Sequence, residues 1–309
     1  MRALSRRAGG IAALLLASVA LAACNPISAR APETPDPEAV SRGRYLVTAG
    51  NCASCHTSRG GQYMAGGRPM ETPFGVFFTP NLTSDPIDGI GRWRLDDLRR
   101  ALRYGVSPDN QHYYPVFPYG SFTGMSDADI GDLWAYLRTV QAVPQPNRAH
   151  ELGFPFNQRL AMAAWKILFL YRGPLEPAPE QGAVWNRGRY LVTSVTHCAD
   201  CHSPRNILGA IDRSHFMAGV AGRDGGPDGW SAPNLTPDPR SGIGRWAVDD
   251  IAAVLAGHGM RGMHIGGPMR EVVWNTAQLT EEDRRAIAVY VKSLPAVYNV
   301  VRSGGGCCR

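Results

Sequence analysis

Two segments carry apolar side chains at the spacing of one face of a helix, and each segment follows a capping residue. The first places them at i, i+3, i+4 and i+7: Ile130, Leu133, Trp134 and Leu137. The second repeats this spacing with Ile287, Tyr290, Val291 and Leu294. Ser126 and Thr280 stand at the N-cap positions, and Asp129 and Asp283 follow three residues later. The pattern predicts two capped amphipathic helices.

The rest of the chain predicts short helices and long loops. Residues 96–104 and 249–256 each form a short amphipathic pattern after a tryptophan, and residues 160–171 form a more apolar helix that ends at Gly173. The chain contains 35 Gly and 24 Pro, and no alternating run is long enough to predict a sheet. We therefore expect an all-α, loop-rich fold.

An apolar run at residues 11–23 follows Arg2, Arg6 and Arg7. The run is shorter than the roughly 20 residues of a membrane-spanning helix, so it predicts a secretory signal. It ends in Leu-Ala-Ala-Cys24, which resembles the site where bacterial lipoproteins are cleaved and lipidated. Ordinary cleavage after an Ala-x-Ala-like site is the alternative.

These features predict a periplasmic lipoprotein anchored to a membrane in a Gram-negative bacterium. The signal occupies residues 1–23. Residues 24–38 are rich in proline and form an extended tether.

The chain after the tether repeats itself with a period near 150 residues. The sequence RGRYLVT occurs at residues 42–48 and again at 187–193, and Asn-Leu-Thr-x-Asp-Pro with Gly-Ile-Gly-Arg-Trp occurs at 81–93 and 234–246. Such a repeat predicts two similar units. We expect one domain at residues 39–144, a linker at 145–181, a second domain at 182–299 and a flexible tail at 300–309.

The linker belongs to neither repeat and carries a cluster of apolar and aromatic side chains, including Trp165 and Phe169. We interpret its helix as packing between the two domains. A partner-binding face is the alternative.

Each repeat contains one Cys-x-x-Cys-His sequence, the attachment signature of a c-type haem. The two thiols bond to the vinyl groups of the porphyrin, and the histidine binds the iron. The thiols are Cys52, Cys55, Cys198 and Cys201, and the histidines are His56 and His202. A zinc site needs further ligands at matching spacing, and a dithiol redox site needs no trailing histidine. The duplicated pattern predicts two covalently bound haem c groups that fill otherwise small cores.

The charge of the chain changes when processing and haem are considered. The formal net charge is +6, but three of the 32 basic residues lie in the predicted signal and four haem propionates add negative charge. The mature protein is then near neutral, so its charge gives no reason to expect nucleic-acid binding. Cys307 and Cys308 end the chain after three glycines, and we expect them to have no structural role, with linkage to another chain as the alternative.

With these motifs in view, the chain resembles the membrane-bound cytochrome c subunits of bacterial periplasmic dehydrogenases for alcohols, gluconate and N-heterocycles. The resemblance rests on both repeated stretches and on three further sequences: residues 114–119 (YPVFPY), 154–157 (FPFN) and 267–273 (GPMREVV). Alcohol-type members carry three haems, whereas this chain has two attachment motifs. The resemblance implies an electron-transfer subunit.

The distal iron ligand of the second domain is expected to be Met269. Methionine opposite histidine raises the reduction potential and leaves no open coordination position. Met269 lies in a Gly-rich loop where the family places its methionine. Met260 and Met263 are nearby alternatives with a more ordinary role in the loop or core.

The first domain departs from the family pattern. Alcohol-type relatives have methionine where this chain has Phe117, and phenylalanine cannot bind iron. Met125 is the nearest candidate, although its position directly before the Ser126 cap also suits a hydrophobic staple. His112 is a weaker alternative, Met64 and Met70 are farther away in sequence, and a vacant site remains open.

We therefore expect a dihaem cytochrome that accepts electrons from the catalytic subunit of a periplasmic dehydrogenase. It would pass them to a quinone-linked complex, another cytochrome or a terminal oxidase through small, transient contacts. The alternative is a dihaem redox enzyme, of peroxidase or thiosulfate-oxidising type, with an open site on the first haem. Arg68 and Glu71 are its candidate acid–base residues. A gas or redox sensor is a third and weaker interpretation.

Overall fold

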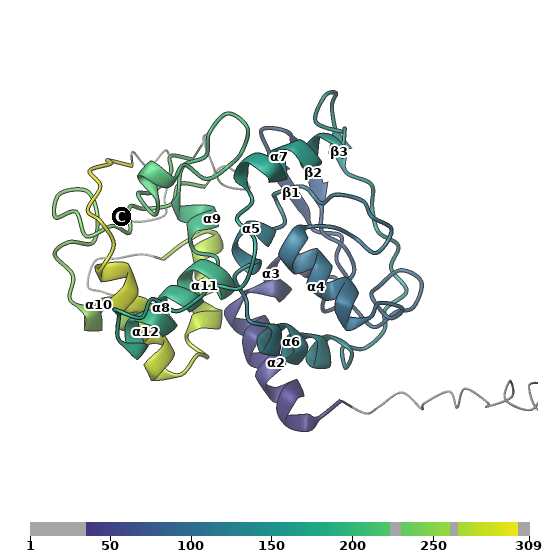
Figure 1. Ribbon diagram of the computed structural model, residues 1–309, viewed down its shortest axis with the longest axis horizontal. Coiled ribbons are helices and arrows are strands. Elements are labelled where there is room, and N and C mark those ends of the chain that lie inside the picture. The colour runs from purple at the N-terminus through teal and green to yellow at the C-terminus, as the bar shows by residue number, and fades with distance from the viewer. Residues whose placement is uncertain (1–34, 223–229, 260–264, 302–309) are drawn as a thin grey trace, which may run out of the picture. The chain divides into compact units, whose positions relative to one another are not determined.

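Helices dominate the parts of the chain that the computed structural model describes, which are residues 35–222, 230–259 and 265–301 (Figure 1). The first repeat and the linker contain the helices α2 (Pro37–Ala49), α3 (Cys52–His56), α4 (Leu95–Tyr104), α5 (Tyr119–Phe122), α6 (Asp127–Leu137) and α7 (Ala161–Phe169). The second repeat contains α8 (Ala183–Tyr190), a π-helical turn (Leu191–Val195), α9 (Ala199–His202), a 3-10 turn (Arg213–His215), α10 (Val248–Leu255), α11 (Pro268–Thr276) and α12 (Glu281–Lys292). The predicted signal, Cys24, Met260, Met263 and the terminal cysteines lie outside these residues.

Both predicted closing helices are confirmed. Ser126 caps α6, and its hydroxyl accepts a hydrogen bond from the Asp129 amide at 3.0 Å. Thr280 caps α12, and its hydroxyl accepts from the Asp283 amide at 3.2 Å. The short helices α4 and α10 are also confirmed, each beginning one residue earlier than expected.

A small sheet corrects the expectation that the fold contains none. Strands β1 (Pro69–Thr72) and β2 (Gly75–Phe78) form an antiparallel hairpin, and β3 (Glu151–Leu152) pairs with the other edge of β2. The strands are four, four and two residues long, which is too short for an alternating pattern to stand out in the sequence. The fold is mostly helical with this sheet added.

Each first helix crosses the closing helix of its own repeat at a glycine. A Cβ atom at Gly43 of α2 would lie 1.9 Å from the carbonyl oxygen of Asp132 in α6. At the equivalent Gly188 of α8, it would lie 2.0 Å from the carbonyl oxygen of Ala286 in α12. The repeated Arg-Gly-Arg sequence therefore marks a close backbone crossing where no larger residue fits.

The two repeats cap each other's closing helix through the tyrosine of the repeated sequence. Tyr45 of α2 donates its hydroxyl proton to Asp283 at 2.6 Å and accepts a hydrogen bond from the Thr280 amide at 3.2 Å. In the reciprocal contact, Tyr190 of α8 donates to Asp129 and accepts from the Ser126 amide at 3.0 Å. We call this pair of contacts the crossed caps. They tie the start of each repeat to the end of the other.

One apolar core continues through both repeats, and the described residues from Pro35 onward belong to a single compact unit. The linker helix α7 contacts both repeats. The indole N–H of Trp165 donates to the Leu208 carbonyl at 2.8 Å, and the Trp165 ring lies 6.2 Å from that of Tyr119. These contacts agree with a packing role for this helix.

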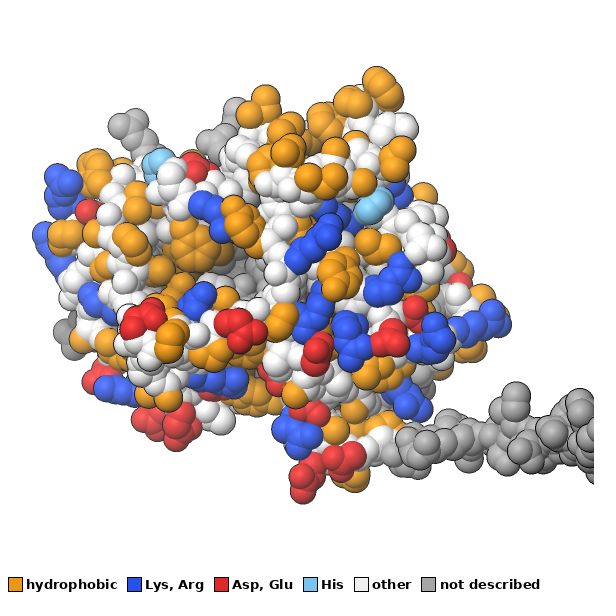
Figure 2. Space-filling view, viewed as in Figure 1, with side chains coloured by type: hydrophobic (Ala, Val, Ile, Leu, Met, Phe, Trp, Pro, Cys, Tyr) orange, Lys and Arg blue, Asp and Glu red, His pale blue; other side chains and the backbone are white. Residues whose placement is uncertain are grey.

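The outer face of α7 stays apolar and exposed. Ile167 and Leu168 are 78% and 66% exposed, and hydrophobic side chains gather in the region of α7 in Figure 2. Within the described ranges, no helix combines the length and apolarity needed to cross a membrane.

The glycine crossing predicts a selective loss of stability. The substitution Gly188→Ala forces α8 away from α12. Overpacking of this kind lowers the free energy of unfolding by about 1–3 kcal/mol. Gly131→Ala is the matched control, because Gly131 lies within α6 and its Cβ would have nothing within 4 Å. It should stabilise the helix by up to about 1 kcal/mol. Urea unfolding measures both changes, and equal effects would contradict the crossing.

The crossed cap at Asp283 predicts a dependence of stability on pH. Burial alone would raise the pKa of Asp283. Hydrogen bonds from Arg187, at 2.7 Å to each oxygen, and from Tyr45 lower it by a larger amount, so the pKa falls below its usual range. A carboxyl with a depressed folded pKa contributes stability above its unfolded pKa of about 3.9. That stability is lost as the pH falls through the folded pKa.

We therefore expect Asp283→Asn to cost about 1.5–3 kcal/mol at pH 7 and to lose less stability than the wild type between pH 5 and pH 3. Asp249→Asn is the control, since the Asp249 side chain is 81% exposed and pairs with Arg285 at the surface. It should cost at most about 1 kcal/mol. Thermal melts across this pH range test the prediction, and parallel curves for the wild type and Asp283→Asn would contradict it.

Candidate haem-attachment sites

A residue in the left-handed conformation leads into each Cys-x-x-Cys-His sequence. Asn51 has φ 53° directly before Cys52, and His197 has φ 40° directly before Cys198. Asn and His are among the residues that tolerate this region best. The chain then turns into the short helices α3 and α9. Helix α3 contains the whole first motif, whereas Cys198 is the N-cap of α9 and the rest of the second motif lies within that helix.

The two motif histidines have the same hydrogen-bond partner in both repeats. Nδ1 of His56 lies 2.8 Å from the carbonyl oxygen of Pro80, and Nδ1 of His202 lies 2.9 Å from that of Pro233. A carbonyl can only accept, so Nδ1 carries the proton and Nε2 keeps its lone pair. Burial lowers the pKa of both histidines despite this hydrogen bond, which favours the neutral ring. A neutral imidazole with an oriented Nε2 is the form that binds a metal.

The repeated Asn-Leu-Thr sequence holds these proline carbonyls in place. Asn81 is 2% exposed, accepts from the Thr83 amide at 2.9 Å and donates to the Val143 carbonyl at 2.8 Å. Asn234 is equally buried and makes the equivalent bonds to the Thr236 amide and the Val297 carbonyl, both at 2.8 Å. The repeat therefore builds a rigid support for the histidine.

One buried methionine lies beside the histidine segment of each motif. Met64 and Met217 are fully buried, with φ 60° and 61°. Their amides donate to the hydroxyls of Thr57 and Ser203, at 3.1 and 2.9 Å, and these residues directly follow the motif histidines. This symmetry gives both methionines the same packing role. Sequence reasoning weighed Met64 only as a remote ligand and did not identify Met217.

The sequence predicts a loop around Met269, but the structure places Met269 in the first turn of helix α11, where it is half-buried. Pro268 begins the helix, and the preceding Gly267 has φ 56°. A Cβ at Gly267 would lie 2.6 Å from the Trp230 ring. The loop before Met269 is therefore held by a glycine that packs directly on tryptophan.

An aromatic cluster surrounds Phe117 in the first repeat. Its ring lies 5.6 Å from Tyr113, 5.8 Å from Phe122 and 6.1 Å from Tyr119. His112 is engaged elsewhere, with Nδ1 3.0 Å from the Nζ atom of the buried Lys166. The Tyr119 hydroxyl is buried with no hydrogen-bond partner in the described structure. A buried hydroxyl of this kind needs a hydrogen-bond partner, which a single water molecule can supply.

Met125 occupies the position equivalent to Leu279, directly before the cap of the closing helix. Both side chains are buried, at 2% and 3% exposed, and both belong to the continuous core. This is the place of a hydrophobic staple. Its chemistry still allows iron binding, because a thioether is the usual distal ligand of a c-type haem.

The candidate acid–base residues Arg68 and Glu71 lie on and beside strand β1. Arg68 contacts the Ser54 carbonyl and lies 3.4 Å from Glu271 of α11. Glu71 is exposed on strand β1, where it pairs with Val76. Met70 lies on the same strand.

The donor set fits covalently attached haem better than a zinc or dithiol site. Burial and the neighbouring Cys55 raise the pKa of Cys52 to about 12. Burial also raises the pKa of Cys198 despite the Thr196 hydroxyl at 3.1 Å. Thiolates are the form needed for redox exchange or zinc binding, and burial disfavours that form at Cys52 and Cys198.

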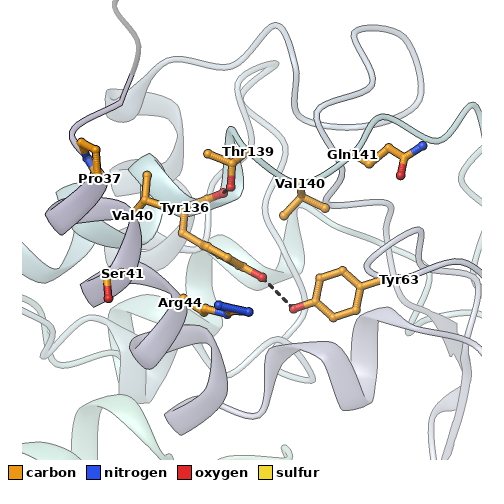
Figure 3. Close-up of a pocket in the computed structure, with 9 residues that line it drawn as sticks. All are labelled: Pro37, Val40, Ser41, Arg44, Tyr63, Tyr136, Thr139, Val140 and Gln141. Atoms are coloured by element: carbon orange, nitrogen blue, oxygen red, sulfur yellow. Dashed lines mark hydrogen bonds between the residues drawn. The ribbon is translucent and has the colours of Figure 1, made fainter.

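A surface hollow of about 490 Å³ lies between α2 and the end of α6 (Figure 3). The hydroxyls of Tyr63 and Tyr136, which line it, are 3.1 Å apart. None of the predicted haem ligands lines this hollow.

Comparison with known proteins connects these sites to named relatives. A cytochrome c family model matches residues 40–141. A dihaem cytochrome c-type protein of Cereibacter sphaeroides is 41% identical over 268 residues, which cover 83% of this chain and 86% of the relative. One of the subunits of nicotinate dehydrogenase from Pseudomonas putida is 45% identical over 257 residues, 82% of this chain but 21% of the relative.

The gluconate 2-dehydrogenase cytochrome c subunit of Pantoea cypripedii is 39% identical over 264 residues, 83% of this chain and 60% of the relative. The chain thus spans nearly the whole of one relative, three fifths of another and about a fifth of the third.

Proposed function

This chain belongs to the family of c-type cytochromes that includes the cytochrome c subunits of bacterial dehydrogenases, and on that premise we propose that it is a dihaem electron-transfer subunit. It accepts electrons from the catalytic subunit of a periplasmic dehydrogenase and delivers them to a quinone-linked complex, a cytochrome or a terminal oxidase. Each haem supplies a one-electron Fe(III)/Fe(II) couple when bound.

One observation carries the proposal: the same histidine geometry occurs twice. The thiols of Cys52 and Cys55 hold the first haem and those of Cys198 and Cys201 the second. His56 and His202 would bind the iron through Nε2, because the proline carbonyls hold Nδ1 at 2.8 and 2.9 Å. A hydrogen bond to the far nitrogen fixes the tautomer and the ring orientation of a metal-binding histidine.

The distal ligands we propose are Met269 for the second haem and Met125 for the first. Met269 lies where the family places its methionine, and Met125 is the thioether nearest in sequence to Phe117.

Membrane attachment is proposed to occur through lipid on Cys24, after export and removal of residues 1–23. The apolar run and the Leu-Ala-Ala-Cys sequence support this step. The several acyl chains of a bacterial lipoprotein anchor far more firmly than a single chain does.

The haem count is the first test. The wild-type mass should show two covalent haems, and the double variant C52A/C55A should show one, as should C198A/C201A. The matched control C307A/C308A also removes two cysteines but lies outside both motifs, so it should keep both haems. A double motif variant that retains two haems would refute the assignment of that motif.

Carbon monoxide binding to the reduced protein tests the distal ligands. The wild type should show no spectral change, because methionine on both irons leaves no open position. Met269→Leu should open one haem to carbon monoxide. Met125→Leu should open the other while costing less than about 1.5 kcal/mol, because leucine already fills the equivalent position at Leu279.

A carbon monoxide adduct on one haem of the wild type would overturn the Met125 assignment. It would place an open site beside Phe117, as the alternative of a dihaem redox enzyme requires. Turnover of peroxide or thiosulfate that His56→Ala abolishes would then be the deciding measurement.

A further inference from the structure

The two attachment segments touch each other through the residue that precedes each motif. Asn51 and His197 are equivalent in the repeat, and both have positive φ. Their side chains leave their own repeat and enter the other one. Asn51 contacts Asn275 of α11, whereas Nε2 of His197 lies 3.1 Å from the carbonyl oxygen of Gly50. Of these two residues, only His197 reaches the backbone that leads into the opposite motif.

The His197 contact joins the two motifs by a continuous path of bonds. His197 is bonded directly to Cys198, and Gly50 is two residues before Cys52. A Cβ atom at Gly50 would lie 3.3 Å from Sγ of Cys52 and 3.4 Å from the Val195 carbonyl oxygen, so the two segments pack closely here. One hydrogen bond and about 17 covalent bonds therefore connect Sγ of Cys198 with Sγ of Cys52, and this path contains no through-space step.

Two further contacts hold this junction in place. The Ser121 hydroxyl of α5 donates to Asp200 of the second motif at 2.7 Å. The His197 ring packs edge-on against Phe122 of the same helix, with the ring centroids 5.4 Å apart. Because His197 is fixed by a hydrogen bond on one side and an aromatic ring on the other, its position is well defined.

The hydrogen-bond partner of His197 determines which of its ring nitrogens carries the proton. The Gly50 carbonyl only accepts, so Nε2 of His197 donates and carries the hydrogen. The junction therefore needs no protonation change when an electron passes through it.

We propose that His197 is the electron-transfer contact between the two haem-bearing segments. Electron tunnelling decays more slowly through covalent bonds and hydrogen bonds than across a van der Waals gap, and this hydrogen bond replaces such a gap. The inference rests on the proposed function, in which both motifs carry haem. The transfer moves one electron from the reduced to the oxidised group, forms and breaks no bond, and leaves the Nε2 proton in place.

The test compares two substitutions at this position. His197→Asn suits the positive φ but is too short to reach Gly50, so it removes the hydrogen bond while keeping the backbone. His197→Gln keeps an N–H donor of similar reach. His215→Asn is the matched control, because His215 is exposed in the second repeat and pairs with Asp212 in its own loop.

The readout is the rate at which an electron redistributes between the haems after flash photoreduction. We expect His197→Asn to slow this rate several-fold, His197→Gln to retain most of it, and His215→Asn to leave it unchanged. Haem content by mass, both midpoint potentials and the EPR spectrum of the oxidised protein are measured on the same samples. These three properties should stay constant, because the substitutions alter the electron path between the haems and not the surroundings of either haem.

An unchanged rate in His197→Asn, with two haems and unaltered potentials, would overturn the proposal. A slower rate that is fully accounted for by shifted potentials or an altered EPR spectrum would also overturn it, since His197 would then only position the motifs. A wild-type protein with fewer than two haems would instead contradict the proposed dihaem function.

Discussion

The hydrogen bond from each motif histidine to a proline carbonyl is the constraint around which the rest of each repeat is arranged. It requires the carbonyls of Pro80 and Pro233 to stay in place, and the buried Asn81 and Asn234 secure them by bonding to the chain near the end of each repeat. A single polar contact thus explains why Asn-Leu-Thr recurs. It also fixes which ring nitrogen is free, which is the property that the proposed iron ligand needs.

The crossed caps likewise use one side chain to satisfy a backbone group, here between the two repeats. Tyr45 and Tyr190 each satisfy an amide at the start of a closing helix, one of the donors that a helix leaves unpaired. The Asp283 cap is the stronger of the two, because Arg187 also binds this carboxylate, whereas the equivalent Arg42 binds Asp132. The residue equivalent to Asp132 in the second repeat is Ala286, and this one difference redirects the arginine.

Local features of the fold were predictable from sequence, and contacts between distant segments were not. The caps at Ser126 and Thr280 and the two motifs follow from spacing alone, because their partners lie within a few residues. The strands of the small sheet are too short for a pattern, and the contact between Tyr45 and Asp283 joins residues 238 positions apart. The role of Phe117 was visible only as a departure from the family, and its aromatic surroundings required the structure.

The crossed caps are reciprocal, as the contacts of a symmetric dimer are. In an isologous dimer, residue i of one subunit contacts residue j of the other, and j contacts i in return. Tyr45 with Asp283 and Tyr190 with Asp129 obey that rule within a single polypeptide. The contact pattern of an isologous pair is therefore present within one chain. Neither half would retain a complete interface if it were separated from the other.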